Sequence, residues 1–304
     1  MCGRFASARK RQELLAEFRV DRDRVTESLE PDYNVAPTKP VYAVLTRAQR
    51  ASSTPETAAP ARELRVVRWG LVPSWAKDPS IGSRLINARA ETVDSKPAFR
   101  KAFSRRRCLL PADGFYEWIS VEDEGRKRKQ PYYIQPADGG LLAFAGLYEL
   151  WRDNSVPDDD PRAWLWTAVI ITTSAQDEVG RIHDRMPMTI EPARWDDWLD
   201  PVNTDASDLR SLLAPALSGG LTSHPVAPDV NYVRNNGPRL IEPLRAGSSA
   251  PPDHKGDAGG SGPAGDGWLG GGPIAGAPGQ AVMTIGPPPG GRDHDPGSAP
   301  PTLF

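Results

Sequence analysis

Short runs rich in aromatic and β-branched residues are the feature that most limits the folds open to this chain. They are bounded by turn-forming residues and do not alternate regularly with helices. A doubly wound parallel sheet needs such alternation, so it fits poorly. We therefore predict an α+β fold built on a curved, mostly antiparallel β-sheet or open barrel with flanking helices. The predicted strands are Val41–Thr46, Leu64–Trp69, Cys108–Leu110, Gly114–Ile119, Tyr132–Gln135, Leu142–Glu149 and Leu165–Ile171.

Helices and turns complete this outline. Gly125 lies in the charged turn Glu122–Lys129, which indicates a hairpin between the two flanking strands. Two stretches rich in Pro with small or acidic residues, Ala48–Arg62 and Asp153–Pro161, are predicted to be loops that join strands. The predicted helices are Ala8–Phe18, Pro97–Arg105, Gln176–Val179, Pro192–Leu199 and Ala206–Leu213.

The end of the chain has a different composition. From about Ala246 to Phe304, Gly and Pro dominate and aliphatic residues are few. Such a segment buries too little apolar surface to offset the entropy lost on ordering. We predict a folded domain over residues 2–245 and a disordered Gly/Pro-rich tail over residues 246–304.

Composition excludes several classes of protein. No run of about 18 apolar residues occurs, so no membrane association is expected. Basic residues between Arg4 and Arg11 interrupt any signal peptide, which makes the cytoplasm the expected compartment. The 2 cysteines, Cys2 and Cys108, cannot form a disulfide framework, and the 4 histidines lack metal-ligand spacing. We expect a monomer without metal or cofactor, and the net charge of −2 neither supports nor excludes a polyanionic substrate.

Cys2 carries the strongest chemical signal. Methionine aminopeptidases remove Met1 before a small residue, which would leave an amine and a thiol with pKa values of roughly 7.7–8.0 and 8.5. The thiolate could attack an acyl carbon, or the amine could form a Schiff base with an aldehyde that the thiol closes into a thiazolidine. Gly3 would let a ligand approach, and Arg4 could hold an anion. A cysteine at this position can also be incidental.

Two downstream segments suit contacts with a nucleotide. Trp69 and Trp75 flank a Gly-Pro turn, where they could stack on a base or a sugar, although core packing explains the pattern equally well. Asn87 and Arg89 would point to the same side of an extended segment. Their amide and guanidinium could clamp phosphate and sugar oxygens. Taken alone, this pair is weak evidence.

Two further segments carry groups suited to proton transfer. Glu117 lies between aromatic residues, where its pKa could be raised and it could act as a general acid or base. The neighbouring Asp113 is predicted to be a turn residue. His183 and Arg185 would lie on one side of an extended segment, and His183 is the natural proton carrier. A purely structural histidine is the alternative.

Taken in order, these segments resemble the SOS response-associated peptidase (SRAP) family, the abasic-site processing proteins. The resemblance covers roughly Cys2 to Leu244, and the loop at Ala48–Arg62 is the main departure. The matching segments are Met1–Phe5, Tyr33–Thr38, Trp69–Trp75, Asn87–Thr92, Arg107–Trp118, Ala143–Tyr148 and His183–Pro187.

The resemblance implies an SRAP-like fold and a function in DNA repair and the SOS response. Proteins of this family capture the aldehyde of an abasic site in single-stranded DNA as a thiazolidine cross-link that shields the lesion. The implied catalytic residues are Cys2, Asn87, Glu117 and His183, and the implied DNA-binding residues are Arg4, Trp69, Trp75, Arg89 and Arg185.

The resemblance also suggests what each catalytic residue would do. Asn87 would hold Cys2 or the sugar oxygen, Glu117 would assist ring opening and proton transfer, and His183 would act as acid or base. The family's peptidase designation rests mainly on the loss of Met1, by self-cleavage or by an aminopeptidase. Schiff-base chemistry would also give lyase-type activity or slow reversal of the cross-link.

Two alternatives share part of this evidence. Class II glutamine amidotransferases also begin Met-Cys-Gly, but the continuation Arg4-Phe5 is unlike theirs and no synthetase-like domain follows. A non-catalytic DNA-binding module would leave the dispersed Asn87, Glu117 and His183 unexplained. Association with the nucleoid is expected. Recruitment of a replication or single-strand-binding protein by the tail stays open.

Overall fold

The computed structural model of the chain describes residues 2–47, 60–123, 125–157, 160, 163–214 and 220–244. The predicted tail and most of the predicted loop at 48–62 lie outside these residues. Ala61 and Arg62, predicted to end that loop, instead begin strand β5. The other predicted loop joins β10 to β11, as expected, although part of it lies outside the described residues.

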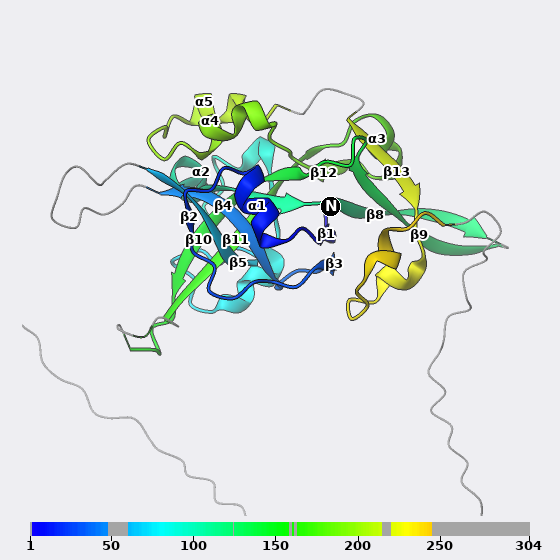
Figure 1. Cartoon of the computed structure of the whole chain (residues 1–304), viewed down its shortest axis with the longest axis horizontal. Helices are drawn as coiled ribbons and strands as arrows, with labels where there is room; N and C mark the ends of the chain where they lie inside the picture. The colour runs from blue at the N-terminus through cyan, green and yellow to red at the C-terminus, as the bar shows by residue number, and fades with distance from the viewer. Residues whose placement is uncertain are drawn as a thin grey trace, which may run out of the picture. The chain divides into compact units, whose positions relative to one another are not determined.

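The elements follow one another in the order of a mixed α+β protein (Figure 1). The strands are β1 (Phe5–Ser7), β2 (Arg22–Asp23), β3 (Asp32–Val35), β4 (Pro40–Arg47), β5 (Ala61–Trp69), β6 (Asn87–Arg89), β7 (Arg107–Ala112), β8 (Gly114–Asp123), β9 (Arg126–Pro136), β10 (Leu142–Arg152), β11 (Trp164–Ser174), β12 (Arg185–Pro187) and β13 (Leu221–Pro225). The α-helices are α1 (Arg11–Glu17), α2 (Arg100–Arg105), α3 (Asp177–Ile182), α4 (Trp195–Leu199) and α5 (Ala206–Ser211). Short 3-10 helices are η2 (Pro79–Arg84), η3 (Ala90–Thr92), η5 (Pro192–Arg194), η6 (Pro228–Asn231) and η7 (Pro238–Ile241).

The larger sheet closes on itself as a barrel. Its strands run in the order β12-β11-β10-β7-β4-β5-β2, and β11 also pairs with β5. The contact between β5 and β11 is parallel, whereas β4–β5, β4–β7, β7–β10 and β10–β11 are antiparallel. An odd number of strands in a ring cannot alternate direction at every step, so one parallel pair is unavoidable. The predicted mostly antiparallel α+β fold is therefore confirmed, with a barrel that is closed rather than open.

The smaller sheet is antiparallel and carries the amino terminus. Its order is β13-β9-β8-β1-β3, so β1 lies between β3 and β8. The predicted hairpin is confirmed: β8 and β9 pair in regular register from Phe115↔Ile134 to Asp123↔Arg126. Gly125 in its turn has φ 75°, a conformation that glycine adopts without steric cost.

The barrel strands are apolar on both faces, which explains their dense aromatic and β-branched sequences. In β4, Val41, Ala43 and Leu45 belong to one core, shared with Cys2, and the intervening Tyr42 and Val44 belong to a second core. The first core joins the barrel to the amino-terminal segment. The second contains residues of every α-helix except α3.

Helices α1, α2 and α5 are shorter than predicted, whereas α3 extends to Ile182, beyond the predicted end at Val179. The segment before α1 is tied elsewhere, because Asp113 accepts hydrogen bonds from the Ala8 amide at 2.6 Å and from Arg9 Nε at 2.9 Å. The predicted helix Pro192–Leu199 divides into η5 and α4. The predicted turn residue Asp113 thus anchors the chain that leaves β1. Within the described residues, no helix combines the length and apolarity needed to cross a membrane.

Phe144 offers a test of this core. Its side chain is fully buried and meets Phe5 and Phe115 edge-on, with ring centroids 5.8 and 6.1 Å apart. Phe144→Ala should lower the free energy of unfolding by about 3–5 kcal/mol, measured by chemical denaturation, because it leaves a cavity. Val202→Ala, at a residue 76% exposed, should change it by about 0.5 kcal/mol or less. Equal losses in the two variants would contradict the placement of Phe144.

Candidate active site at the amino terminus

Cys2 lies in the core that joins the two sheets, with an exposed fraction of 0%. It is held there because β1 starts three residues later and pairs on both sides, through Phe5↔Val35 and Phe5↔Phe115. The Phe5 ring packs edge-on against Trp69, with centroids 5.1 Å apart. Packing of this ring fixes the start of the chain, so Cys2 has a defined place.

Asn87 lies beside Cys2 although it is distant in sequence. Strand β6 pairs with β11 through Ile170↔Asn87, and this pairing brings the amide to the amino terminus. Asn87 Nδ2 donates a hydrogen bond of 2.7 Å to the Cys2 carbonyl oxygen. Asn87 Oδ1 is buried and has no hydrogen-bond partner among the described residues. This oxygen is therefore an acceptor suited to an amine or hydroxyl beside Cys2.

Glu117 is the buried carboxyl of the site, at 3% exposure in β8. Burial raises its pKa, and an electrostatic interaction with His183 is among the influences that oppose the shift. Burial also raises the pKa of the Cys2 thiol, and the charge of Glu117 adds to that shift. Glu117 is thus close enough to both Cys2 and His183 to interact with each of them electrostatically.

His183 follows α3 and donates its backbone N–H to the Val179 carbonyl at 2.9 Å. Its Nδ1 lies 2.9 Å from the Arg185 amide nitrogen and 2.9 Å from a carboxylate oxygen of Asp184. A backbone N–H can only donate, so Nδ1 accepts in the neutral ring and Nε2 carries the proton. A hydrogen bond to Asp184 would need a proton on Nδ1, and the Asp184 side chain is 87% exposed to solvent, which weakens this contact.

The structure thus brings the predicted catalytic residues to one place. Asn87 contacts Cys2, Cys2 is influenced by Glu117, and Glu117 by His183. They come from four separate segments: the start of the chain, β6, β8 and the turn before β12. An amide that holds the cysteine, a carboxyl with a raised pKa near the thiol and an imidazole near that carboxyl can position a nucleophile and move protons.

The two predicted tryptophans differ in position. The prediction that Trp69 lines a DNA channel is wrong, because its side chain is 0% exposed and Nε1 donates to the Ile86 carbonyl at 2.9 Å. It therefore packs in the core, the alternative left open by the sequence. Trp75 is 63% exposed and can meet a ligand.

Two of the predicted phosphate-binding arginines are engaged within the protein. Arg185 donates to both carboxylate oxygens of Glu91, at 2.5 and 3.1 Å, and to the Thr172 carbonyl at 2.6 Å. Its charge is balanced by Glu91, which contradicts a role in gripping phosphate. Arg4 donates from Nη1 to Asn34 Oδ1 and to the Val230 carbonyl, both at 2.7 Å, and neither acceptor is charged, so its role in binding phosphate stays a prediction. Arg89 is exposed, on the same side of β6 as Asn87 because Ala88 between them is buried.

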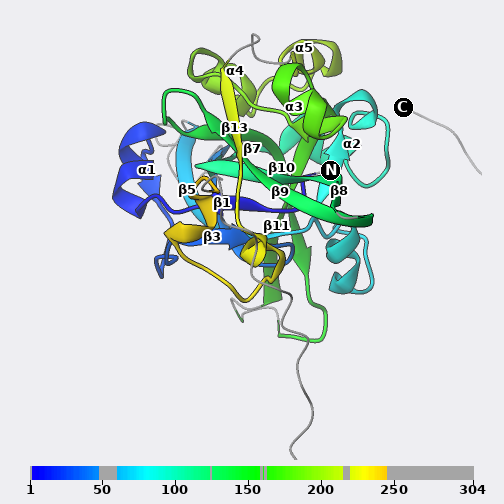
Figure 2. The same ribbon diagram turned by 90° about the vertical axis from the view of Figure 1, so that its right-hand side faces the viewer.

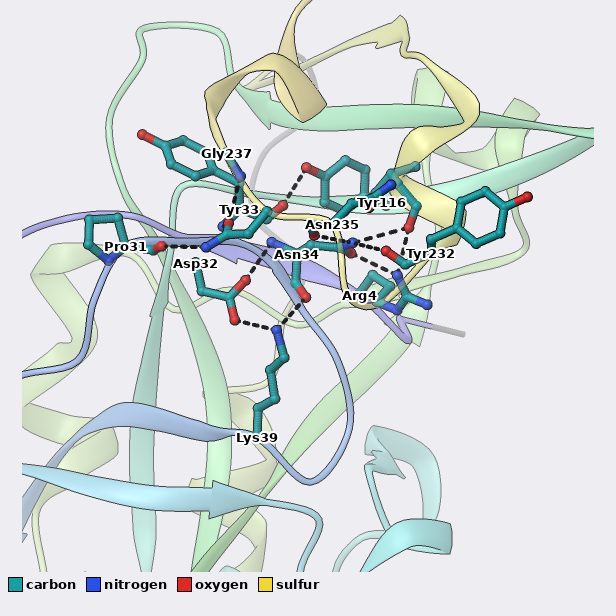
Figure 3. A network of polar contacts seen from close by, with 12 residues as sticks. Arg4, Pro31, Asp32, Tyr33, Asn34, Lys39, Tyr116, Tyr232, Asn235 and Gly237 are labelled. Carbon is teal, nitrogen blue, oxygen red and sulfur yellow. Dashed lines mark hydrogen bonds and ion pairs between the residues drawn. The ribbon is translucent and has the colours of Figure 1, made fainter. Parts of the chain in front are cut away.

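Asn34 is the residue that the sequence analysis missed. Its buried amide donates to the carbonyl oxygens of Val230, Tyr232 and Asn235 at 3.2, 3.1 and 3.0 Å and accepts from Arg4 at 2.7 Å (Figure 3). Arg4 also donates to the Val230 carbonyl at 2.7 Å. Asn34 was part of a matching segment, but nothing nearby in sequence indicated these partners. The network ties the end of the domain to the residues next to Cys2.

Similarity to solved structures and to curated proteins defines the class of this chain. A crystal structure of a protein from Bacteroides thetaiotaomicron aligns with a TM-score of 0.63 at 25% identity, covering 80% of this chain and 100% of that one. The abasic site processing protein YoqW of Bacillus subtilis is 38% identical over 242 residues, which cover 80% of this chain and 99% of YoqW. The abasic site processing protein YedK of Escherichia coli is 32% identical, covering 80% of this chain and 100% of YedK.

The profile of the family described as "SOS response associated peptidase (SRAP)" matches residues 1–233. The chain belongs to the SRAP family, as its ordered segments predicted.

The burial of Glu117 predicts a pH-dependent stability. Because its pKa is raised in the folded protein, its contribution to stability is full below its unfolded pKa, about 4.3, and is lost as pH rises through the folded pKa. The free energy of unfolding of the wild type relative to Glu117→Gln should therefore fall over that range in urea titrations. Glu122→Gln, which removes an exposed carboxyl of the same strand, should give no such trend. A difference that rises with pH would contradict the assignment.

Proposed function

We propose that this protein processes abasic sites in single-stranded DNA by forming a thiazolidine cross-link through Cys2 after removal of Met1. The observation that carries the proposal is the contact of Asn87 with the Cys2 carbonyl, with Glu117 influencing the Cys2 thiol and His183 influencing Glu117. The relatives' designation as abasic site processing proteins gives independent support.

The proposed reaction needs only the aminothiol and the open sugar. The Cys2 amine attacks the aldehyde carbon, and the adduct loses water to become a Schiff base. The thiol sulfur then adds to the same carbon, the C=N bond becomes single, and the thiol proton passes to nitrogen. Closing the ring removes the imine that would otherwise promote elimination of the neighbouring phosphate. The lesion is thus shielded from strand cleavage.

Each neighbouring side chain has a task in this scheme. Asn87 holds the Cys2 carbonyl, and its unpaired Oδ1 accepts from the freed amine or from a sugar hydroxyl. Glu117, which retains its proton more readily because it is buried, donates it to the departing sugar oxygen. His183 takes a proton from the attacking amine and returns it if the cross-link reverses. A lyase-type outcome would follow where ring closure fails.

The central test is cross-linking to an oligonucleotide with one abasic site. The wild type should give a denaturant-resistant species of lower mobility without any reductant. Cys2→Ala should give it only after borohydride reduction, because its terminal amine still forms a Schiff base but no ring can close. A stable unreduced species in Cys2→Ala would overturn the proposal, and so would an intact mass that retains Met1. Glutaminase activity without cross-linking would favour the amidotransferase alternative.

The proton-transfer roles predict slower chemistry. Glu117→Gln and His183→Ala should each reduce the single-turnover rate of cross-linking by about 10²–10⁴-fold, because each removes a positioned acid or base. Ser120→Ala, at an exposed residue further along the strand of Glu117, is the control and should react at the wild-type rate. Wild-type rates in both test variants would limit the proposal to Cys2 and Asn87.

A further inference from the structure

One arginine side chain connects the two elements that bring Asn87 and His183 to the site. Arg185 is the first residue of β12, two residues after His183. Its side chain crosses β11, where Nη2 donates to the Thr172 carbonyl oxygen at 2.6 Å. The guanidinium then meets both carboxylate oxygens of Glu91, at 2.5 and 3.1 Å, in the short helix η3 that directly follows β6. The start of β12 is thus fastened to the end of β6 across the strand between them.

The backbone of the same arginine sets the orientation of the imidazole. Its N–H donates to His183 Nδ1 at 2.9 Å. In the ladder between β11 and β12, the Asp184 carbonyl accepts from the Ala175 amide at 2.9 Å, whereas the Arg185 N–H is turned to the ring. With Nδ1 engaged as an acceptor, Nε2 is the ring atom at which His183 exchanges a proton.

Strand β12 depends on side chains for its position. It has three residues and forms an edge of the larger sheet, so it has few ladder hydrogen bonds of its own. The side chain of Arg185 is 12% exposed, and that of its partner Glu91 is 50% exposed. A planar guanidinium held by two carboxylate oxygens and a carbonyl oxygen has little freedom to turn. Fixing this side chain therefore helps to fix the peptide whose N–H meets the imidazole.

Glu91 is suited to act as the anchor of this connection. Its hydrogen bond with Arg185 lowers the pKa of its carboxyl group, which therefore keeps its charge at neutral pH. The positive charge of Arg89 acts in the same direction. A charged acceptor holds a guanidinium more strongly than a neutral one, so removal of the charge should release the arginine.

We propose that Glu91 is a positioning residue for His183: through Arg185, it holds the imidazole with Nδ1 turned to the backbone and the proton on Nε2. The inference rests on the proposed function, in which His183 moves protons, and adds to it the device that selects the tautomer. The same anchor fixes the spacing between the elements of His183 and Asn87. An ion pair with a purely structural role would stabilise the edge strand and leave the state of the ring unchanged.

Nitrogen NMR of protein labelled at its histidines tests the tautomer without DNA. Spectra are recorded where the imidazole is neutral, and the His183 signals are assigned by their loss in His183→Ala. The wild type should show a protonated Nε2 and an unprotonated Nδ1, and Glu91→Gln should show a mixture of both tautomers. Glu178→Gln, which removes an exposed carboxyl from the helix that leads to His183, is the control and should match the wild type.

The rate of cross-linking supplies the second readout. With protein in saturating excess over abasic DNA, Glu91→Gln should lower the single-turnover rate by about 10–100-fold, because the proton carrier is misplaced. Saturation removes any change in DNA affinity that arises from Arg89, which Glu91 also attracts. Arg185→Lys keeps the positive charge but not the planar fork, so its rate and its tautomer mixture should lie between those of the wild type and Glu91→Gln.

Several outcomes overturn this inference. A wild-type tautomer in Glu91→Gln would show that the ion pair is only structural, even if the melting temperature falls. Mixed tautomers with a wild-type rate would show that the orientation of the ring does not matter. If Glu91→Gln does not fold, wild-type values of both readouts in Arg185→Lys overturn the inference instead. If the wild type fails to cross-link, the proposed function fails, and the NMR measurement still decides whether Glu91 holds the imidazole.

Discussion

The pairing of β11 with strands on both of its sides is the constraint on which the rest of the site depends. On one side it closes the barrel through β5 and then continues with β6, and on the other it pairs with β10 and then β12. Asn87 enters the site from β6, and His183 from the turn that leads into β12. The smaller sheet meets this end of the barrel, where the segment before β1 supplies Cys2 and β8 supplies Glu117 (Figure 2).

The electrostatics of the site follow from this junction. Both Cys2 and Glu117 lie in an apolar region, where charged forms are disfavoured and the pKa of each is raised. Loss of the first residue would place a second ionisable group, the amine, beside the same carboxyl. A reactive group kept in its neutral form until a substrate arrives is protected from side reactions with solvent and oxidants.

Sequence patterns predicted the strands and turns that are determined by their own local sequence. The barrel strands were recognisable because both of their faces are apolar, and the hairpin because a glycine follows a charged run at its turn. Short strands such as β1 and β13 were missed, since three to five residues carry too little pattern. Their existence depends on the sheet to which they pair.

The candidate site shows the same division. The residue types were enough to predict Cys2, Asn87, Glu117 and His183 as site residues. The surroundings of the other predicted residues depend on partners that are distant in the chain. Trp69 and Trp75 belong to one sequence motif. Trp69 is buried against Phe5 whereas Trp75 is exposed, and the motif itself does not indicate this difference. Glu91 neutralises Arg185 because β12 and η3 both lie beside β11, which no local spacing indicates.

The Asn34 network has a consequence for the order of events during synthesis. It ties residues near the start of the chain to the carbonyl groups of Val230, Tyr232 and Asn235, which are among the last of the domain to be made. On the ribosome, the nascent amino terminus therefore lacks its final support until nearly the whole domain has emerged. The proposed removal of Met1 would thus precede completion of the fold around Cys2, at a stage when processing enzymes still have access to the terminus.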